Sequence, residues 1–230
     1  DVSVGVVVPL SSQVGGDVSL DLDSFMKEVT EGDKLGSRTQ GDVYPYKLAD
    51  GREVAVKIAK LPSSILMGPW ALQMSSWTVE NEGEALKLMK GVEGVPQFIG
   101  WVTSRNGNKR GLVMEKVPLH TDYREASKVA PGSAGKFRKI IETAHERGVV
   151  HRDTENPGNT VVTASGEVYV LDWGISVRKD TIEAENFETA KKEEEYYEDE
   201  IASHLVALEI AQEENDLINA LAQAQAGVCG

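Results

Sequence analysis

The sequence predicts an α+β protein with two lobes, a strand-rich one followed by a mostly helical one. Residues 53–59 alternate β-branched and other residues after an Ala49-Asp50-Gly51 turn signal, as in a half-buried strand. From about Glu183 almost every residue favours helix. The 230 residues suffice for two small lobes. We expect an N-terminal arm and short helix over 1–30, a first lobe over 31–117 and a reduced helical lobe over 118–230.

Turn residues and hydrophobic periodicity place the elements in order. We expect an irregular arm (1–20), an amphipathic helix (20–29), two strands around a tight turn (32–60), an irregular connection (62–78), a helix (79–90), strands (96–103 and 111–116), a helix (135–147), a hairpin (160–171) and C-terminal helices (from about 183). The apolar residues of these last helices are candidate core contacts, namely Ile201, Leu205, Leu208, Leu217 and Leu221.

Composition and charge exclude several classes of function. A net charge of −13 argues against a nucleic-acid partner, because phosphate backbones require a basic surface. No apolar run approaches the roughly 20 residues of a membrane span, and the N-terminus lacks the basic region of a signal peptide. Cys229 is the single cysteine, which rules out an intramolecular disulfide. We expect a soluble, cytosolic-type monomer, and we interpret the acidic stretch 183–214 as a solvated helix face in preference to an interaction patch.

The first group of functional candidates combines glycines, a lysine and a glutamate. Gly36 and Gly41 lie five residues apart before a valine, a spacing that lets backbone N–H groups face phosphates. Lys57 follows within an apolar strand, where an ammonium group needs negative partners. Glu82 on the helix over 79–90 is our preferred carboxylate, with Glu84 and then Glu80 as the alternatives.

The second group lies around the hairpin over 160–171. His151-Arg152-Asp153 precedes the hairpin and Asp172-Trp173-Gly174 follows it, with Asn159 between them. One carboxylate can orient a nucleophilic hydroxyl, while a second carboxylate and an amide oxygen bind Mg²⁺. These are the side chains that phosphoryl transfer requires.

Together, in this order, the motifs resemble those of the protein kinase superfamily, and the resemblance runs from Leu35 to Gly174. It implies ATP and Mg²⁺, with Mn²⁺ as an alternative ion. It assigns catalytic roles to the lysine–glutamate pair and the catalytic loop, namely Lys57, Glu82, His151, Arg152 and Asp153. The metal ligands would be Asn159 and Asp172. The nucleotide would be contacted by the glycine-rich loop, the lysine strand and the hinge, namely Gly36, Arg38, Gly41, Val43, Ala55, Lys57, Met114, Glu115 and Val117.

Several positions depart from the family pattern. Arg38 replaces the middle glycine of the loop, and Trp173 replaces the usual phenylalanine. Asn159 lies six residues after Asp153 where the family expects five, so Asn156 stays open as the alternative ligand. Glu155 stands in place of a lysine that contacts the γ-phosphate, a contact that Arg38 could replace. Only 56 residues follow Gly174, without an Ala-Pro-Glu triplet, so we expect a C-terminal lobe of few helices and no activation-loop switch.

Such a minimal kinase resembles bacterial effector kinases delivered into eukaryotic cells by a type III system. One plant-pathogen type phosphorylates the host heat shock protein 90 chaperone, and this is the narrower interpretation that we prefer. We expect transfer of the γ-phosphate to a serine or threonine of a protein substrate, with tyrosine and AMP transfer left open. The alternatives are a pseudokinase that acts as an ATP-binding scaffold and a small-molecule kinase of the aminoglycoside type.

Overall fold

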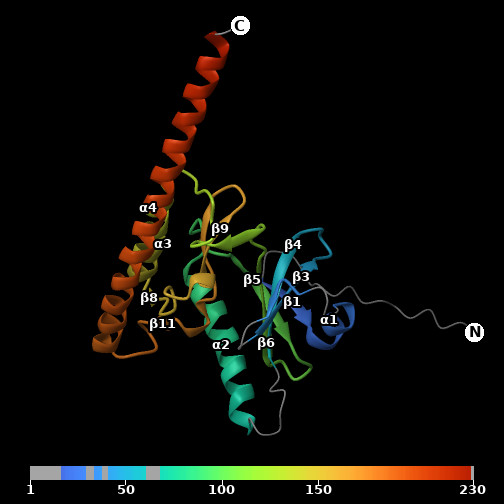
Figure 1. The fold of residues 1–230 in the computed structure, drawn as a ribbon. Helices are drawn as coiled ribbons and strands as arrows, with labels where there is room; N and C mark the ends of the chain where they lie inside the picture. The colour runs from blue at the N-terminus through green and yellow to red at the C-terminus, as the bar shows by residue number, and fades with distance from the viewer. Residues whose placement is uncertain (1–16, 30–33, 38–40, 61–67, 229–230) are drawn as a thin grey trace, which may run out of the picture. The chain divides into compact units, whose positions relative to one another are not determined.

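The computed structural model describes residues 17–29, 34–37, 41–60 and 68–228, with the side chains of 68–75, 221, 222 and 224–228 left out. Arg38 and Cys229 therefore lie outside the described residues. The chain forms two compact units, shown in Figure 1. The first comprises residues up to Lys90 together with Pro96–Lys116, and the second comprises Gly91–Val95 together with the chain from Val117 onward.

The first unit is built on a β-sheet whose described strands are ordered β1-β5-β6-β4-β3-β2. They are β1 (Val18–Asp21), β2 (Gly36–Ser37), β3 (Gly41–Lys47), β4 (Glu53–Ala59), β5 (Phe98–Thr103) and β6 (Lys109–Glu115). Neighbouring strands are antiparallel except β1, which runs parallel to β5 with Val18 opposite Gly100. A Cβ atom on Gly100 would overlap the Val18 carbonyl group, so this strand pairing requires glycine there. The expected irregular arm is thus wrong at Val18–Leu20.

The predicted alternation of β4 decides which side chains enter the core. Val54 and Val56 are fully buried on one face of the sheet. Ala55 and Lys57 point to the opposite face, because successive side chains of a strand alternate. The valine face packs into a core with residues of β1, β3, β5, β6 and the first helix, namely Val18, Leu20, Phe25, Tyr44, Leu48, Val102 and Val113.

The described residues of this unit form two helices, α1 (Leu22–Glu28) and α2 (Gly68–Leu88). The side chain of Asp21 caps α1 by accepting a hydrogen bond from the Ser24 N–H at 2.9 Å, which lowers the pKa of this carboxyl group. The helix α2 begins eleven residues before the predicted start at residue 79, so the irregular connection is wrong from Gly68 onward. Pro69 lies in its first turn, where proline is well tolerated.

The second unit combines short strands with two helices. Its described elements are β7 (His120–Asp122), α3 (Ser133–Glu146), β8 (Val149–Val150), the 3-10 turn η3 (Pro157–Asn159), β9 (Thr160–Thr163), β10 (Val168–Val170), the 3-10 turn η4 (Trp173–Ile175), β11 (Val177–Arg178) and α4 (Ala184–Val228). The hairpin β9–β10 and the helix α3 match the predicted elements. The strands β7, β8 and β11 were not predicted; β7 pairs with β9 and β11 pairs with β8. Two- and three-residue strands are too short to show a periodicity.

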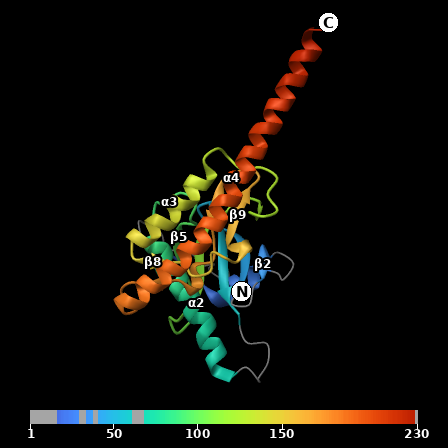
Figure 2. The same ribbon diagram turned by 60° about the vertical axis from the view of Figure 1, so that its left-hand side comes forward.

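The helix α4 is a single element of 45 residues rather than several short helices. Its first half packs through one buried face, formed by Phe187, Ala190, Glu194, Glu198, Ile201 and Leu205. The predicted core contacts fail further along, because Leu208 is only partly buried and Leu217 is exposed; the side chain of Leu221 lies outside the described ones. Figures 1 and 2 show this end of α4 projecting beyond α3. Neither α4 nor any other helix in the described ranges is apolar enough over sufficient length to cross a membrane.

Candidate active site

A buried ion pair in the first unit joins β4 to α2. The Nζ atom of Lys57 lies 2.6 Å from Oε2 of Glu82, with the two residues 4% and 2% exposed. Glu84, the alternative partner, instead contacts Lys87 at 3.1 Å and Lys109 at 3.2 Å. Glu80 is exposed. The choice between the three glutamates therefore falls on Glu82, which lies on the helix face that covers the sheet.

The close approach of α2 to the sheet depends on the residue next to Glu82. A Cβ atom on Gly83 would overlap the indole ring of Trp101 on β5. A glycine here allows the helix to lie against the strand, and this brings the Glu82 carboxylate within reach of Lys57. Two ammonium groups also lie over the Trp101 ring, those of Lys109 at 4.2 Å and Lys87 at 5.1 Å from its centroid.

The other nucleotide-contact candidates of this unit gather around the same face of the sheet. Val43 is paired with Lys57, and Ala55 with Met114, in the registers of β3–β4 and β4–β6. Directly paired residues lie on one face of a sheet, so these side chains share the face of Lys57. A Cβ atom on Gly41 would lie 2.9 Å from the Ile58 carbonyl oxygen and 3.2 Å from Cγ of Lys57. Glycine is therefore needed at 41 to fit β3 beside the lysine.

Three more of these candidates lie near strand ends. Gly36 on β2 pairs with Val43. Glu115, the last residue of β6, uses Oε2 to accept a hydrogen bond from the Gln97 N–H at 3.1 Å. Val117 follows β6 and already belongs to the second unit. The side chain of Glu115 is therefore held to Gln97, the residue that precedes β5.

In the second unit His151 connects the two loops that carry the other candidates. Its Nδ1 atom accepts a hydrogen bond from the Asp153 N–H at 3.2 Å, so its Nε2 atom is the one that donates to the Leu171 carbonyl at 2.8 Å. The imidazole also packs edge to face on Trp173, with ring centroids 4.6 Å apart. Both rings are fully buried. Thus His151 acts structurally on the loops, and Trp173 occupies the position of the usual phenylalanine as a core residue.

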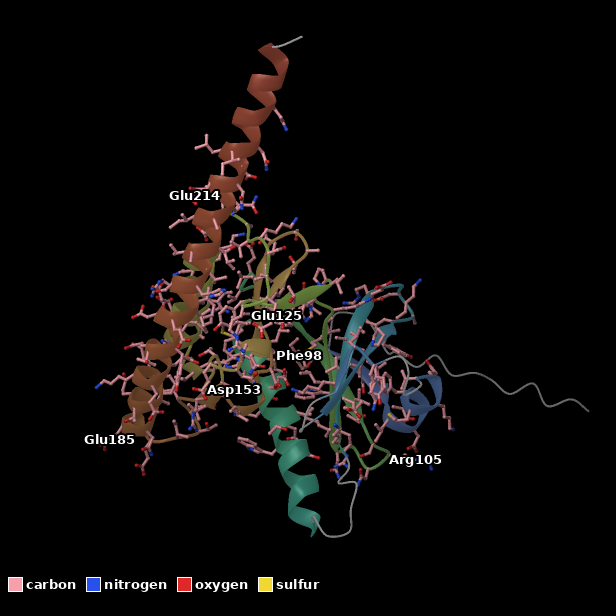
Figure 3. All side chains as sticks on the ribbon, viewed as in Figure 1. Phe98, Arg105, Glu125, Asp153, Glu185 and Glu214 are labelled. Atoms are coloured by element: carbon pink, nitrogen blue, oxygen red, sulfur yellow. The ribbon has the colours of Figure 1, made fainter. Side chains whose placement is uncertain are left out.

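Asp153, labelled in Figure 3, lies beside Asn159. The Nδ2 group of Asn159 donates to Oδ2 of Asp153 at 2.7 Å and to its carbonyl oxygen at 2.9 Å. Asn156 approaches the same Oδ2 only at 3.4 Å. Asn159 is fully buried, while Asn156 is partly exposed. The longer loop therefore still brings the later asparagine to the aspartate.

Asp172 is tied to this group through the backbone. The N–H of Leu171 donates to the Asn159 carbonyl at 2.7 Å, which places the next residue, Asp172, beside η3. A carboxylate with an amide oxygen is a donor set that suits Mg²⁺, which usually takes one or two carboxylates and completes its shell with water and substrate phosphates. Among the described residues no group of three or more His, Cys, Asp or Glu side chains could hold a metal ion. The Asp172 carboxylate and the Asn159 amide oxygen fit a magnesium ion that is shared with a phosphate substrate.

Backbone strain occurs at two of these motifs. Arg152 has φ of 68° and Asp172 has φ of 61°, and they are the two non-glycine residues with positive φ among those described. This left-handed conformation is uncommon and costly for residues with a Cβ atom, and strained residues of this kind cluster at active sites and ligand-binding sites. Arg152 immediately precedes Asp153, and Asp172 is itself one of the two residues. The strain therefore lies at one carboxylate and directly beside the other.

Glu194 on α4 is a residue of the site that sequence reasoning missed. It is 2% exposed, and its carboxylate accepts hydrogen bonds from the backbone N–H groups of Arg152 at 2.9 Å and His151 at 3.2 Å. The Nε2 atom of His145 on α3 lies 2.8 Å from the same carboxylate. Glu194 therefore holds the strained backbone before Asp153 in place. In the sequence, apolar neighbours at helical spacing are the sign that Glu194 could be buried. This sign is hard to recognise because Glu194 lies within the run Glu193-Glu194-Glu195.

Replacement of Glu194 by glutamine tests this role. Glutamine keeps the shape but turns one acceptor into a donor, so one buried N–H group loses its partner at a cost of about 1–3 kcal/mol. We expect the free energy of unfolding to fall by about 2 kcal/mol in urea denaturation. Glu198→Gln is the control, because Glu198 lies one turn later on the same helix. Its partner Arg138, at 3.3 Å, also contacts Asp199 at 2.8 Å, so Arg138 still has an acidic partner in this variant. Equal losses in the two variants would contradict a specific role for Glu194.

Comparison with known proteins gives relatives of one class. The chain is 26% identical over 169 residues to the serine/threonine-protein kinase pim-2 of Danio rerio, a match covering 65% of this chain and 53% of that protein. It is 29% identical over 189 residues to the RIO-type serine/threonine-protein kinase Rio2 of Methanocaldococcus jannaschii, covering 72% and 67%. It is 29% identical over 133 residues to the serine/threonine-protein kinase PknA of Mycobacterium tuberculosis, covering 55% and 30%. No family model matches the chain.

These relatives support placing the chain in the protein kinase superfamily, since all three are serine/threonine kinases. The fold agrees, with a sheet unit carrying one long helix and a second, mainly helical unit, as in a small kinase-like α+β fold. The chain spans about half the length of the Danio rerio relative and 67% of the archaeal one.

Proposed function

We propose that this chain is an ATP- and Mg²⁺-dependent protein kinase that transfers the γ-phosphate to a serine or threonine hydroxyl. The observation that carries the proposal is the Asp153–Asn159 pair beside Asp172, with left-handed backbone at Arg152 and Asp172. The costly backbone conformation occurs at Asp172 and directly before Asp153. The carboxylates of these two aspartates, in neighbouring loops, are suited to bind a metal ion and to orient a hydroxyl. The serine/threonine kinase relatives support the same reaction class.

In this proposal each side chain of the site has one task. Lys57, held by Glu82, binds the α- and β-phosphates, with backbone N–H groups near Gly36 and Gly41 facing the phosphates. Val43 and Ala55 contact the adenine, whose edge is bound by the backbone from Met114 to Val117. Catalysis then consists of positioning and charge stabilisation, because phosphoryl transfer demands little covalent chemistry from the protein.

The remaining tasks belong to the second unit. Asp172 and Asn159 hold Mg²⁺, which neutralises charge on the phosphates when bound, with Mn²⁺ as an alternative ion. Asp153 orients the hydroxyl of the substrate and accepts its proton. The hydrogen bond from Asn159 to Oδ2 of Asp153 restricts the carboxylate to one orientation, which reduces the entropy lost on reaching the transition state. Arg152 and His151 support the loop, with Glu194 behind them.

A pseudokinase scaffold is the second candidate function, and the intact site argues against it. Lys57, Asp153, Asn159 and Asp172 are all present, and the lysine and its glutamate are already paired. A small-molecule kinase is suggested by Pro157-Gly158-Asn159 and by Trp173. The protein-kinase relatives favour a protein substrate instead. As the narrower proposal, the chain is a type III effector with the host heat shock protein 90 chaperone as its substrate.

The test is incubation of the chain with Mg²⁺ and γ-labelled ATP, with the chaperone, a eukaryotic lysate and an aminoglycoside in separate reactions. We expect label on serine or threonine of protein, and its loss in Asp172→Ala because the metal ligand is removed. Label on the aminoglycoside alone would establish the small-molecule reaction. Label from α-labelled ATP would show AMP transfer. Equal labelling by wild type and Asp172→Ala would refute the metal assignment.

A further inference from the structure

The C-terminal half of α4 carries an exposed apolar stripe that the described chain does not cover. Val206, Ile210 and Leu217 are 44%, 52% and 61% exposed. Every described side chain from Glu213 to Ala220 is exposed as well. Figure 3 shows Glu214 on this projecting half, clear of the other elements of its unit. An isolated helical segment of this length is only marginally stable in water, so a packing partner would add considerable stability.

The stripe is not a continuation of the face that packs within the second unit. That face is formed by Glu194, Glu198, Ile201 and Leu205, at spacings of three and four residues. At about 100° per residue, Val206, Ile210 and Leu217 lie roughly 130° around the helix from it. It therefore cannot be covered by an extension of the contacts that α4 makes with α3. The projecting half presents a separate surface.

The spacing of the stripe is that of a coiled-coil seam. Ile210 and Leu217 are seven residues apart and take the a positions of successive heptads, while Val206, Glu213 and Ala220 take the d positions. Three of the flanking g and e positions are acidic, namely Glu209 and Asp216 at g and Glu214 at e, while the other e positions are Ala207 and Leu221. Glu209 also accepts a hydrogen bond from the Ala134 N–H at 3.0 Å, so it lies at the boundary with α3. Residues 193–230 contain ten acidic residues and no lysine or arginine.

These charges select the kind of partner. In a two-stranded coiled coil the e and g residues of one helix face those of the other, so acidic positions here favour lysine or arginine there. A second copy would place carboxylates against carboxylates, and in a parallel pair the two Glu213 side chains would meet in the core. We propose that the C-terminal half of α4 binds a basic amphipathic helix of another protein as a two-stranded coiled coil. This inference is independent of the proposed kinase activity.

The probe is a synthetic three-heptad peptide with leucine at a and d and lysine at e and g, titrated against the whole chain by fluorescence anisotropy. We expect binding that becomes at least about 30-fold weaker in Ile210→Ala/Leu217→Ala, because two buried side chains are lost. The matched control, Asn215→Ala/Asn219→Ala on the outer face of the same helix, should bind as the wild type does. Alanine favours helix in both variants, so neither unfolds the segment.

Two further peptides separate the seam from simple charge attraction. A peptide with glutamate at e and g should not bind, and one that keeps lysine but has serine at a and d should bind at least tenfold more weakly (about 1.4 kcal/mol). Equal binding of the serine peptide would overturn the proposal, since net charge alone would explain it. The proposal would also be overturned if the leucine–lysine peptide did not bind. The same holds if sedimentation showed that the chain forms a dimer and the peptide did not bind.

Discussion

Replacing Asp153 by asparagine should lower the rate of phosphate transfer by about 10²–10⁴-fold and leave nucleotide affinity nearly unchanged. The substitution removes the group that accepts the proton of the substrate hydroxyl. It keeps an oxygen that can receive the hydrogen bond from Asn159, observed at 2.7 Å to Oδ2. The loop should therefore keep its conformation. Initial rates with γ-labelled ATP, together with calorimetric titration of the nucleotide, measure the two effects separately.

Glu155→Gln is the matched control for Asp153→Asn. Glu155 lies two residues later on the same loop, is exposed, and hydrogen-bonds the hydroxyl of Tyr197, a contact that raises the pKa of Tyr197. The Glu155→Gln substitution also removes one negative charge without changing the shape of the side chain. Unlike Asp153, however, Glu155 has no assigned contact with the substrate hydroxyl or the metal ion. Transfer by this variant should stay within about threefold of the wild type, since exposed groups contribute little. If both variants lose activity equally, the loss is caused by the change in charge of the loop in general. The assignment of Asp153 as the base then fails.

Replacing Lys57 by methionine should lower the free energy of unfolding by about 3–5 kcal/mol. The change removes the ammonium group that lies 2.6 Å from Glu82, and the carboxylate stays buried without that partner. A buried charge that loses its counter-ion is much more costly than a lost surface ion pair. Urea denaturation followed by tryptophan fluorescence, to which Trp101 beside α2 contributes, measures the loss. Phosphate transfer should also be abolished if the proposed function holds.

Two variants give this measurement its controls. The double substitution Lys57→Met/Glu82→Leu removes both charges and should recover most of the lost stability, because an apolar pair of similar volume often replaces a buried ion pair without cost. Lys116→Met breaks a more exposed pair with Glu53, observed at 2.8 Å, and should cost less than about 1 kcal/mol. A Lys57→Met protein as stable as the wild type would mean that the ion pair does not contribute to folding.

Much of the fold could be read from local patterns. The alternation of β4, the hairpin β9–β10 and the helix α3 follow from periodicity and turn residues within one short window. The start of α2 and the length of α4 could not be read this way. Pro69 signals a loop or a first helical turn equally well, and the apolar residues at the end of α4 suit a core or an exposed seam equally well. Only their surroundings distinguish the two cases.

The side chains proposed for phosphoryl transfer, and their order along the chain, are evident from the amino-acid sequence alone. A lysine within an apolar strand, and aspartates on both sides of a hairpin, indicate the chemistry without any coordinates. Tertiary structure decided which groups meet. Glu82 rather than Glu84 reaches Lys57 across 25 residues, and Glu194 reaches Arg152 across 42. Such contacts depend on how helices pack against strands and loops. Helical spacing indicates which face of a helix is buried, but it does not indicate which distant residue that face will meet.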